Sequence, residues 1–342
     1  MELVQQKRLL GLVTKAYAEN RRLVAPLAVF PGCDLTGFSI KVAQQNYGVL
    51  FACISAIVKL LKPDIAFGMM DLSVEANALG LPVRFPIDES STVEKHPINS
   101  LEQIDHYRRI NILQDSRIQC YIKTIEMMSI GLPQEIIKCA YVIGPVTLAG
   151  LLESAQQLAM DSVLEPEKLH GLCQFSTEVI QEYVRAIINA GANLICILEP
   201  TAVMLGPEQF RQFSGYYVHH IIESYKYAKV ETIYHVCGNT MHLLKEMVDC
   251  GIAAISLDSP ETGIDMVKAL QIVPEDIVVI GNINPTSTMK DGTIEKVRQK
   301  TKNLLEKMRP YPNFLLSTGC DLPPGTPVEN MLEFMRVGRE FK

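Results

Sequence analysis

The chain of 342 residues has no tryptophan, no long hydrophobic run and no cluster of basic residues. Its longest mostly apolar stretch, residues 47–61, is too short to span a bilayer and is interrupted by Ser55 and Lys59. The formal net charge is −6, and basic residues do not alternate with aromatic ones. We therefore expect neither a membrane nor a nucleic acid as a partner. Residues 1–8 read as a charged helical start rather than a signal peptide, which favours a cytoplasmic protein.

The cysteine and glycine patterns exclude two further classes. Nine cysteines are an odd number without framework spacing, so free thiols or metal ligands are expected rather than disulfides. Cys33, Cys237 and Cys320 stand beside glycine near the ends of strand-like runs, whereas most of the others have apolar neighbours. No Gly-x-Gly-x-x-Gly turn follows the first strand-like run, which counts against a dinucleotide-binding fold.

What the sequence does contain is a regular alternation of apolar runs and helical patterns. Such near-continuous apolar runs are typical of parallel strands that are buried on both faces. Eight of them predict a (β/α)8 barrel in one domain, residues 1–342, with an N-terminal helical extension at 1–22. An open doubly wound sheet is the alternative. The eight runs are residues 23–30, 64–71, 139–145, 193–200, 232–237, 253–258, 277–282 and 314–320. The principal expected helices are 7–21, 39–61, 101–131, 241–249, 293–308 and 328–341, with an irregular excursion at 81–97.

Polar side chains collect where these strands end, at the face that carries the active site in barrel enzymes. Asp34 and Asp321 are also typical loop or cap residues. Asp71 and Glu199 are stronger candidates, because burying a carboxylate at the end of an apolar strand is costly without a task. The full set is Asp34, Asp71, Glu199, His235, Cys237, Asp258, Asn282, Cys320 and Asp321.

His235 and Cys237 are two residues apart, so on a strand their side chains leave from the same face. An imidazole nitrogen and a thiolate are ligands that zinc prefers, and Cys320 offers a third. Asp258 on the neighbouring strand could supply an exchangeable oxygen. A thiol entering that fourth position would lose its proton and become a good nucleophile. The alternative interpretation is a core cysteine beside a strand-end histidine.

Three motifs carry a resemblance to a known family. They are Tyr-His-Val-Cys-Gly-Asn at 234–239, Ile-Gly-Asn-Ile at 280–283, and the run at 317–330 that begins Ser-Thr-Gly-Cys-Asp. Together they resemble the uroporphyrinogen decarboxylase superfamily, and more narrowly its methylcobamide:coenzyme M methyltransferase branch. The resemblance covers nearly the whole chain.

The resemblance implies a (β/α)8 barrel with zinc on His235, Cys237 and Cys320, and it places Asp258 where the branch has an acidic residue. It also implies a methylated corrinoid (methylcobalamin type) as methyl donor, carried by a small corrinoid protein. We expect Asp71, Glu199 and Asn282 to orient the acceptor or support the zinc ligands. Cofactor contacts are expected at Gly144 and Asn239.

The methyl acceptor stays open at this stage. Coenzyme M is one thiol acceptor, although its sulfonate calls for a cation, and Arg84 is the nearest candidate by sequence. Tetrahydrofolate is the alternative. A uroporphyrinogen decarboxylase is more distant, because residues 30–37 lack the arginines that hold substrate carboxylates in that enzyme. A non-catalytic corrinoid-binding module is the remaining possibility.

Overall fold

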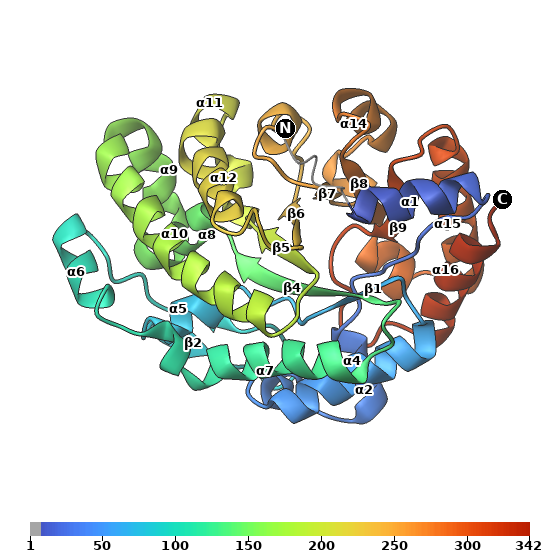
Figure 1. The fold of residues 1–342 in the computed structure, drawn as a ribbon, viewed down its shortest axis with the longest axis horizontal. Helices are drawn as coiled ribbons and strands as arrows, with labels where there is room; N and C mark the ends of the chain where they lie inside the picture. Colours follow the sequence, from blue (N-terminus) through green and yellow to red (C-terminus); the bar gives the residue numbers. More distant parts are fainter. Residues whose placement is uncertain (1–7) are drawn as a thin grey trace.

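A computed structural model describes residues 8–342 of the chain (Figure 1). Seven parallel strands pair in the order β1-β4-β5-β6-β7-β8-β9, and helices surround them. Residues 1–7, which hold most of the expected charged start, lie outside the described part. The strands of the large sheet are β1 (Ile65–Phe67), β4 (Ile137–Ile143), β5 (Leu194–Leu198), β6 (Glu231–Val236), β7 (Ala254–Leu257), β8 (Val278–Ile283) and β9 (Phe314–Thr318).

The expected first strand, residues 23–30, is wrong as a regular strand, but the segment takes the eighth place in the barrel. Val24 forms an isolated parallel bridge with Leu316 of β9, and its carbonyl accepts a hydrogen bond from Asp64, which precedes β1. Pro26 has no N–H to donate, so a continuous ladder cannot form. The segment thus joins β9 to β1, which supports a (β/α)8-type barrel over an open sheet.

The helices largely follow the expected alternation. Within residues 8–342, no helix combines the length and the apolar character that crossing a bilayer requires. The α-helices are α1 (Arg8–Ala18), α2 (Phe30–Thr36), α3 (Ile40–Ala43), α4 (Tyr47–Leu61), α5 (Val74–Ala78), α6 (Ile104–Tyr107), α7 (Ser116–Gly131), α8 (Pro145–Glu153), α9 (Ala155–Leu164), α10 (Pro166–Asn189), α11 (Pro207–Gln209), α12 (Tyr216–Glu223), α13 (Leu244–Val248), α14 (Met266–Ile272), α15 (Ile294–Met308) and α16 (Val328–Glu340).

Two long helices expected from the sequence are broken by capping residues. The helix expected at 39–61 is divided into α3 and α4, because the Asn46 side chain accepts hydrogen bonds from the first N–H groups of α4. The helical stretch expected at 101–131 is interrupted before α7, where Asp115 caps the helix in the same way. The excursion at 81–97 contains a short antiparallel pair, β2 (Val83–Arg84) and β3 (Thr92–Val93).

The interior of the barrel is apolar near the amino ends of the strands, where helix α1 covers it. Leu9, Val13 and Ala16 of α1 are buried against the inner residues of the strands. The backbone N–H of Leu9 also donates to a Glu231 carboxylate oxygen at the start of β6, over 2.8 Å. The part of the N-terminal extension that is described therefore closes the amino end of the barrel, opposite the carboxyl ends of the strands.

Candidate metal centre at the carboxyl ends of the strands

Two of the candidate ligands lie at the carboxyl end of β6: His235 within the strand and Cys237 directly after its last residue. Ile233 of β6 packs in the barrel interior, so His235 and Cys237, two and four residues later, continue the same inner face. His235 is fully buried, whereas Cys237 is partly exposed. Gly238 then turns the chain with φ +88°, a conformation that favours glycine.

Cys320, the third candidate ligand, lies two residues after the end of β9. The His235 Nε2 atom lies 3.2 Å from Cys237 Sγ, and Cys237 Sγ lies 3.9 Å from Cys320 Sγ. Ligand atoms of all three residues lie within 4.8 Å of one another. Tetrahedral zinc with Zn–S of about 2.3 Å and Zn–N of about 2.0–2.1 Å requires ligand separations of about 3.5–3.8 Å. The donor set and its spacing therefore fit a zinc ion.

Ser256 fixes the orientation of the imidazole. It is paired with His235 in the β6–β7 register, and its hydroxyl oxygen lies 3.0 Å from His235 Nδ1. This contact uses one ring nitrogen and leaves Nε2 facing the two sulfur atoms. Sequence reasoning missed Ser256, although it occupies the inner position of its strand at the level of His235.

Neighbouring groups of the site shift the pKa values of His235 and Cys320. Burial disfavours the charged form of His235, but its hydrogen bond with Cys320 and the charges of Cys320 and Asp258 outweigh burial and raise its pKa. The hydrogen bond with Cys237 and burial raise the pKa of the Cys320 thiol well above its usual value. A divalent cation acts in the opposite direction on the thiols, because it stabilises the thiolate.

Asp258, expected as a fourth ligand, is not part of this three-residue group. One of its oxygens accepts the Gly238 N–H over 2.7 Å, and the other accepts the Ser259 N–H over 2.6 Å. Both bonds hold backbone, so the carboxylate anchors the turn that follows Cys237. In this structure Asp258 stabilises the backbone next to Cys237, a candidate ligand.

Asn282 lies on the inner face of β8, which also carries Val278 and Ile280. Its side-chain amide donates to the Asp258 carbonyl over 2.8 Å. The other side-chain atom, Oδ1, is buried without a hydrogen-bond partner in the described structure. The structure thus places Asn282 at the rim, beside the loop that Asp258 anchors.

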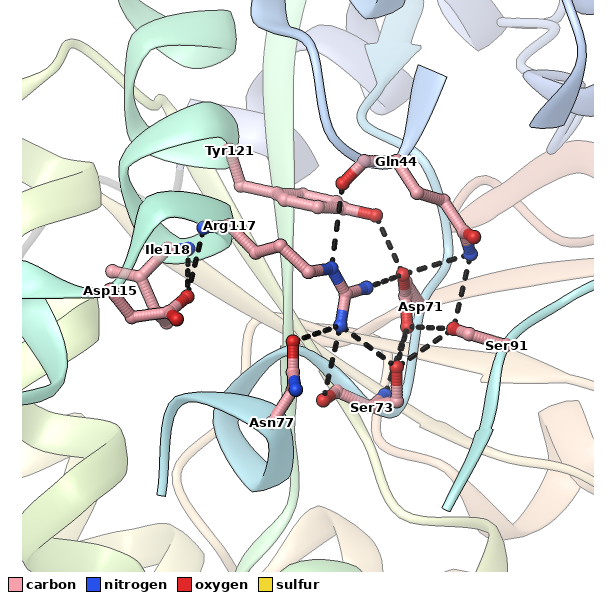
Figure 2. A network of polar contacts seen from close by, with 9 residues as sticks. All are labelled: Gln44, Asp71, Ser73, Asn77, Ser91, Asp115, Arg117, Ile118 and Tyr121. Carbon is pink, nitrogen blue, oxygen red and sulfur yellow. Dashed lines mark hydrogen bonds and ion pairs between the residues drawn. The ribbon is translucent and has the colours of Figure 1, made fainter. Parts of the chain in front are cut away.

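Asp71 lies instead in a buried polar network, shown in Figure 2. Its carboxylate pairs with Arg117 of α7 over 2.5 Å and accepts from the Tyr121 hydroxyl over 2.7 Å and from Gln44 over 3.0 Å. Ser73 and the Ser91 hydroxyl occupy its second oxygen. Burial favours the neutral acid, but the Arg117 charge and these hydrogen bonds prevail and lower the Asp71 pKa.

Glu199 faces the helical layer rather than the barrel interior. It follows Leu198, an inner residue, and its carboxylate accepts hydrogen bonds from the N–H groups of Val146 and Thr147 at the start of α8. A Cβ atom at Gly144 would lie 1.8 Å from a Glu199 oxygen, so glycine is needed there to make room. Burial raises the pKa of Glu199 to about 7. Glu199 and Gly144 therefore join β5 to α8.

Asn239 and Arg84, two further residues expected from the sequence, have exposed positions. Asn239 lies in the loop after β6, and its side chain accepts the Met241 N–H over 3.2 Å. A corrinoid contact at Asn239 stays a prediction. Arg84 of β2 forms a 3.9 Å ion pair with Glu94 and is largely exposed.

The chain matches a known protein family. A profile of the uroporphyrinogen decarboxylase (URO-D) family matches residues 35–341. The chain is 26% identical to the methylcobamide:CoM methyltransferase MtbA of Methanosarcina acetivorans, over 80% of this chain and 78% of that protein. It is 28% identical to a uroporphyrinogen decarboxylase from a Synechococcus species, over 81% and 78%.

A solved structure described as a methyltransferase from Methanosarcina mazei has the same fold. It superposes with a TM-score of 0.84 at 23% identity, covering 96% of this chain and 97% of that one. The family profile spans most of the chain and confirms the resemblance drawn from the sequence motifs. The chain is therefore an enzyme of the uroporphyrinogen decarboxylase (URO-D) family.

Proposed function

We propose that this enzyme is a zinc-dependent methyltransferase that moves a methyl group from a methylated corrinoid, carried by a corrinoid protein, to a thiol. The observation that carries the proposal is the group formed by His235, Cys237 and Cys320 at the barrel mouth. Three strong ligands and one remaining position distinguish catalytic from structural zinc sites. The partial exposure of both cysteines leaves the group accessible from the mouth.

A zinc ion bound to these three residues would lower the pKa of an incoming thiol and supply a thiolate at neutral pH. The protein's own part is positioning. Ser256 holds the His235 ring, and Asp258 holds the turn that follows Cys237. Asn282 ties the Asp258 backbone to β8.

The transfer balances as a displacement between two nucleophiles. The lone pair of the thiolate sulfur forms the new S–C bond while the Co–C bond breaks, and that bonding pair stays on cobalt as Co(I). No external oxidant or reductant is needed. The names of relatives such as MtbA, a methylcobamide:CoM methyltransferase, support this reaction class.

Decarboxylation of a porphyrinogen is less consistent with the site. Asp71 matches the aspartate of the decarboxylases by resemblance, yet here its carboxylate is saturated by Arg117, Tyr121 and neighbouring donors. The segment at 30–37, which lacks arginine, forms helix α2.

None of the nine cysteines, all of which lie in the described part, is paired in a disulfide, which favours a reducing compartment such as the cytoplasm.

The test is demethylation of methylcobalamin by the purified protein, with zinc measured on the same sample. Acceptors would be a panel of thiols and tetrahydrofolate. We expect thiol-dependent demethylation that falls at least about 100-fold in Cys237→Ala and Cys320→Ala. Cys120→Ala, which removes a buried cysteine of α7, is the matched control and should retain activity.

The outcomes separate the candidate functions. Demethylation with tetrahydrofolate alone would assign the nitrogen acceptor, and carbon dioxide release from uroporphyrinogen would revive the decarboxylase. Tight corrinoid binding with no demethylation by any acceptor would leave a non-catalytic binding module.

A further inference from the structure

A cavity of about 920 Å³ lies at the amino ends of the strands. Its lining includes Asp64, which precedes β1, and Ile137, the first residue of β4. The candidate metal centre lies at the other end of the barrel, where β6 and β9 end. Small-molecule sites in proteins usually measure about 300–1,000 Å³, so this cavity has the size of a ligand site. The proposed reaction does not use it.

Three helices supply much of the cavity wall. Helices α4 and α7 run side by side (Figure 1), and α1 adds Leu12 and Lys15 to the wall. A Cβ atom at Gly131, the last residue of α7, would lie 2.6 Å from Cζ of Phe51. The glycine therefore leaves room for the Phe51 ring, which lines the same cavity.

The cavity is apolar at its base and charged at its opening. Its buried side chains are aliphatic, whereas the lysines that line the same cavity are exposed. Sites of this kind take up the apolar body of a ligand and orient it through a few polar groups. The buried aliphatic residues of the lining are Leu23, Val58, Leu132, Ile136 and Ile137.

The charged side chains of the lining are mostly basic. Four basic side chains oppose two acidic ones, an excess of two positive charges in a chain whose net charge is −6. The Asp64 carboxylate is engaged with the backbone, because its Oδ2 accepts the Val24 N–H over 2.7 Å. An anion that enters the opening would therefore meet a positive potential. The charged residues are Lys15, Arg21, Lys59, Lys62, Asp64 and Glu135.

Three of these lysines have no structural partner that accounts for their position. Within residues 8–342, Lys15, Lys59 and Lys62 form neither an ion pair nor a side-chain hydrogen bond. A lysine near the end of a helix can also stabilise the helix dipole. At α4 this role is filled by Arg339, whose guanidinium donates to the carbonyls of Leu61 and Lys62 over 2.5 Å. The three ammonium groups are thus available to an anionic ligand.

We propose that this cavity binds an aliphatic carboxylate, such as a medium-chain fatty acid anion. The hydrocarbon chain would pack against the aliphatic base, and the carboxylate would lie among Lys15, Lys59 and Lys62 at the opening. Burial of the chain supplies affinity, and the lysines select an anionic head group over a neutral or cationic one. The site is independent of the proposed methyl transfer, because it lies at the opposite end of the barrel.

The direct test is isothermal titration of the full-length protein with octanoate, 1-octanol and octylammonium, which share one chain and differ in the head group. We expect octanoate to bind at least about tenfold more tightly than octylammonium, because the lysines attract only the anion. Hexanoate should bind at least about fivefold more weakly than octanoate, because it buries fewer methylene groups. Raising the ionic strength should weaken octanoate binding and leave 1-octanol binding unchanged.

Neutralising the three lysines tests the head-group site. The combined variant Lys15→Gln, Lys59→Gln and Lys62→Asn should bind octanoate at least about tenfold more weakly, with 1-octanol unaffected. Asparagine is chosen at position 62 because the backbone there has φ +49°, which asparagine adopts readily. The matched control replaces three exposed lysines of α15 by glutamine and should retain the affinity for octanoate. The control positions are Lys300, Lys302 and Lys307.

Filling the cavity tests the hydrocarbon site. Ser55 of α4 lines the cavity, and Ser55→Leu places a larger apolar side chain there. This variant should weaken the binding of octanoate and of 1-octanol by at least about tenfold, because leucine occupies volume that the hydrocarbon needs. Thermal unfolding of each variant shows whether the fold is intact.

The contrary results are equally definite. Absence of octanoate binding, or equal affinity for octanoate and octylammonium, would overturn the proposal. So would an affinity for octanoate that neither the lysine variant nor Ser55→Leu changes, because the ligand would then bind elsewhere. A dimer in analytical ultracentrifugation that Ser55→Leu dissociates would show that a second copy of the chain covers the cavity, which also overturns it. These measurements need no corrinoid and no turnover, so they do not depend on the proposed function.

Discussion

The hydroxyl of Ser256 lies 3.0 Å from Nδ1 of His235, on the neighbouring strand and in register with it. This contact selects the ring nitrogen that faces the two cysteines. The geometry of the candidate metal site is therefore set by the pairing of β6 with β7 as well as by the three candidate ligands themselves. Such supporting partners typically contribute 10–100-fold to metal affinity.

Ser256→Ala should weaken zinc binding by about 10–100-fold, because the imidazole loses the partner that orients it. The measurement is zinc competition against a chromophoric chelator. Ser256→Thr keeps the hydroxyl and is expected to retain most of the affinity. Equal affinity in the alanine variant and the wild type would show that packing alone holds the ring.

The Asp71–Arg117 pair should act chiefly on stability. Side-chain exposure is 5% for Arg117 and 1% for Asp71, so Arg117→Met leaves an unpaired buried carboxylate. We expect a loss of about 3–5 kcal/mol in the free energy of unfolding by urea. Arg108→Met, which breaks the exposed pair with Glu178, should cost less than about 1 kcal/mol. Comparable losses in both variants would contradict a structural role for the buried network (Figure 2).

Helix α1 offers a second test of the fold. Leu9 is fully buried against the lower barrel interior, and Leu12 on the same helix is 37% exposed. Leu9→Ala should lower the free energy of unfolding by about 2–5 kcal/mol, because it opens a cavity beneath the strands. Leu12→Ala should have a much smaller effect. Zinc affinity should stay unchanged in both variants, because the candidate metal site lies at the opposite end of the barrel from α1. A large drop in zinc affinity would show that packing at the amino end affects the candidate metal site.

Stability should decrease as the pH rises from about 5 to 8. Burial raises the pKa of Glu75 and of Glu199 to about 7. The native state therefore holds protons that the unfolded chain, with glutamate pKa near 4.3, has already lost. Stability from these groups is complete below about pH 4.3 and is lost as the pH passes about 7. Asp71, whose pKa is lowered, contributes above about pH 4 and loses its effect only in acid.

Urea unfolding midpoints measured across this range check the sign. Glu199→Gln should show a shallower decline with pH, because it removes one of the carboxyl groups whose pKa is raised to about 7. A midpoint that rises between pH 5 and 8, or an unchanged slope in the variant, would show that these carboxyl groups are ionised in the native protein.

The sequence predicted the strand order and the close approach of the three candidate metal ligands, because each rested on a local pattern. His235 and Cys237 share an inner face by simple alternation, and Cys320 ends the last strand. The orientation of Glu199 was not predictable in this way. Every residue of β5 is buried, so its two faces look alike in the sequence, and only the structure shows that Glu199 faces α8.

Other features depended on distant partners. The expected role of Asp71 at the catalytic site stays a prediction. Its carboxylate is held by Arg117, 46 positions along the chain, and no local signal marks that pairing. The first strand was expected to be regular, yet Pro26 interrupts its ladder. Asp258 has the identity and position of a ligand, but both of its oxygens are taken by adjacent backbone N–H groups.

The central claim is that His235, Cys237 and Cys320 hold one zinc ion with a position left for a thiol. Zinc K-edge X-ray absorption tests it directly, in the wild-type protein with and without saturating thiol. We predict two sulfur ligands at about 2.3 Å with nitrogen or oxygen at about 2.0–2.1 Å, and three sulfur ligands once the thiol is added. A zinc ion without two sulfur ligands, or a sulfur count that stays at two with thiol present, would contradict it.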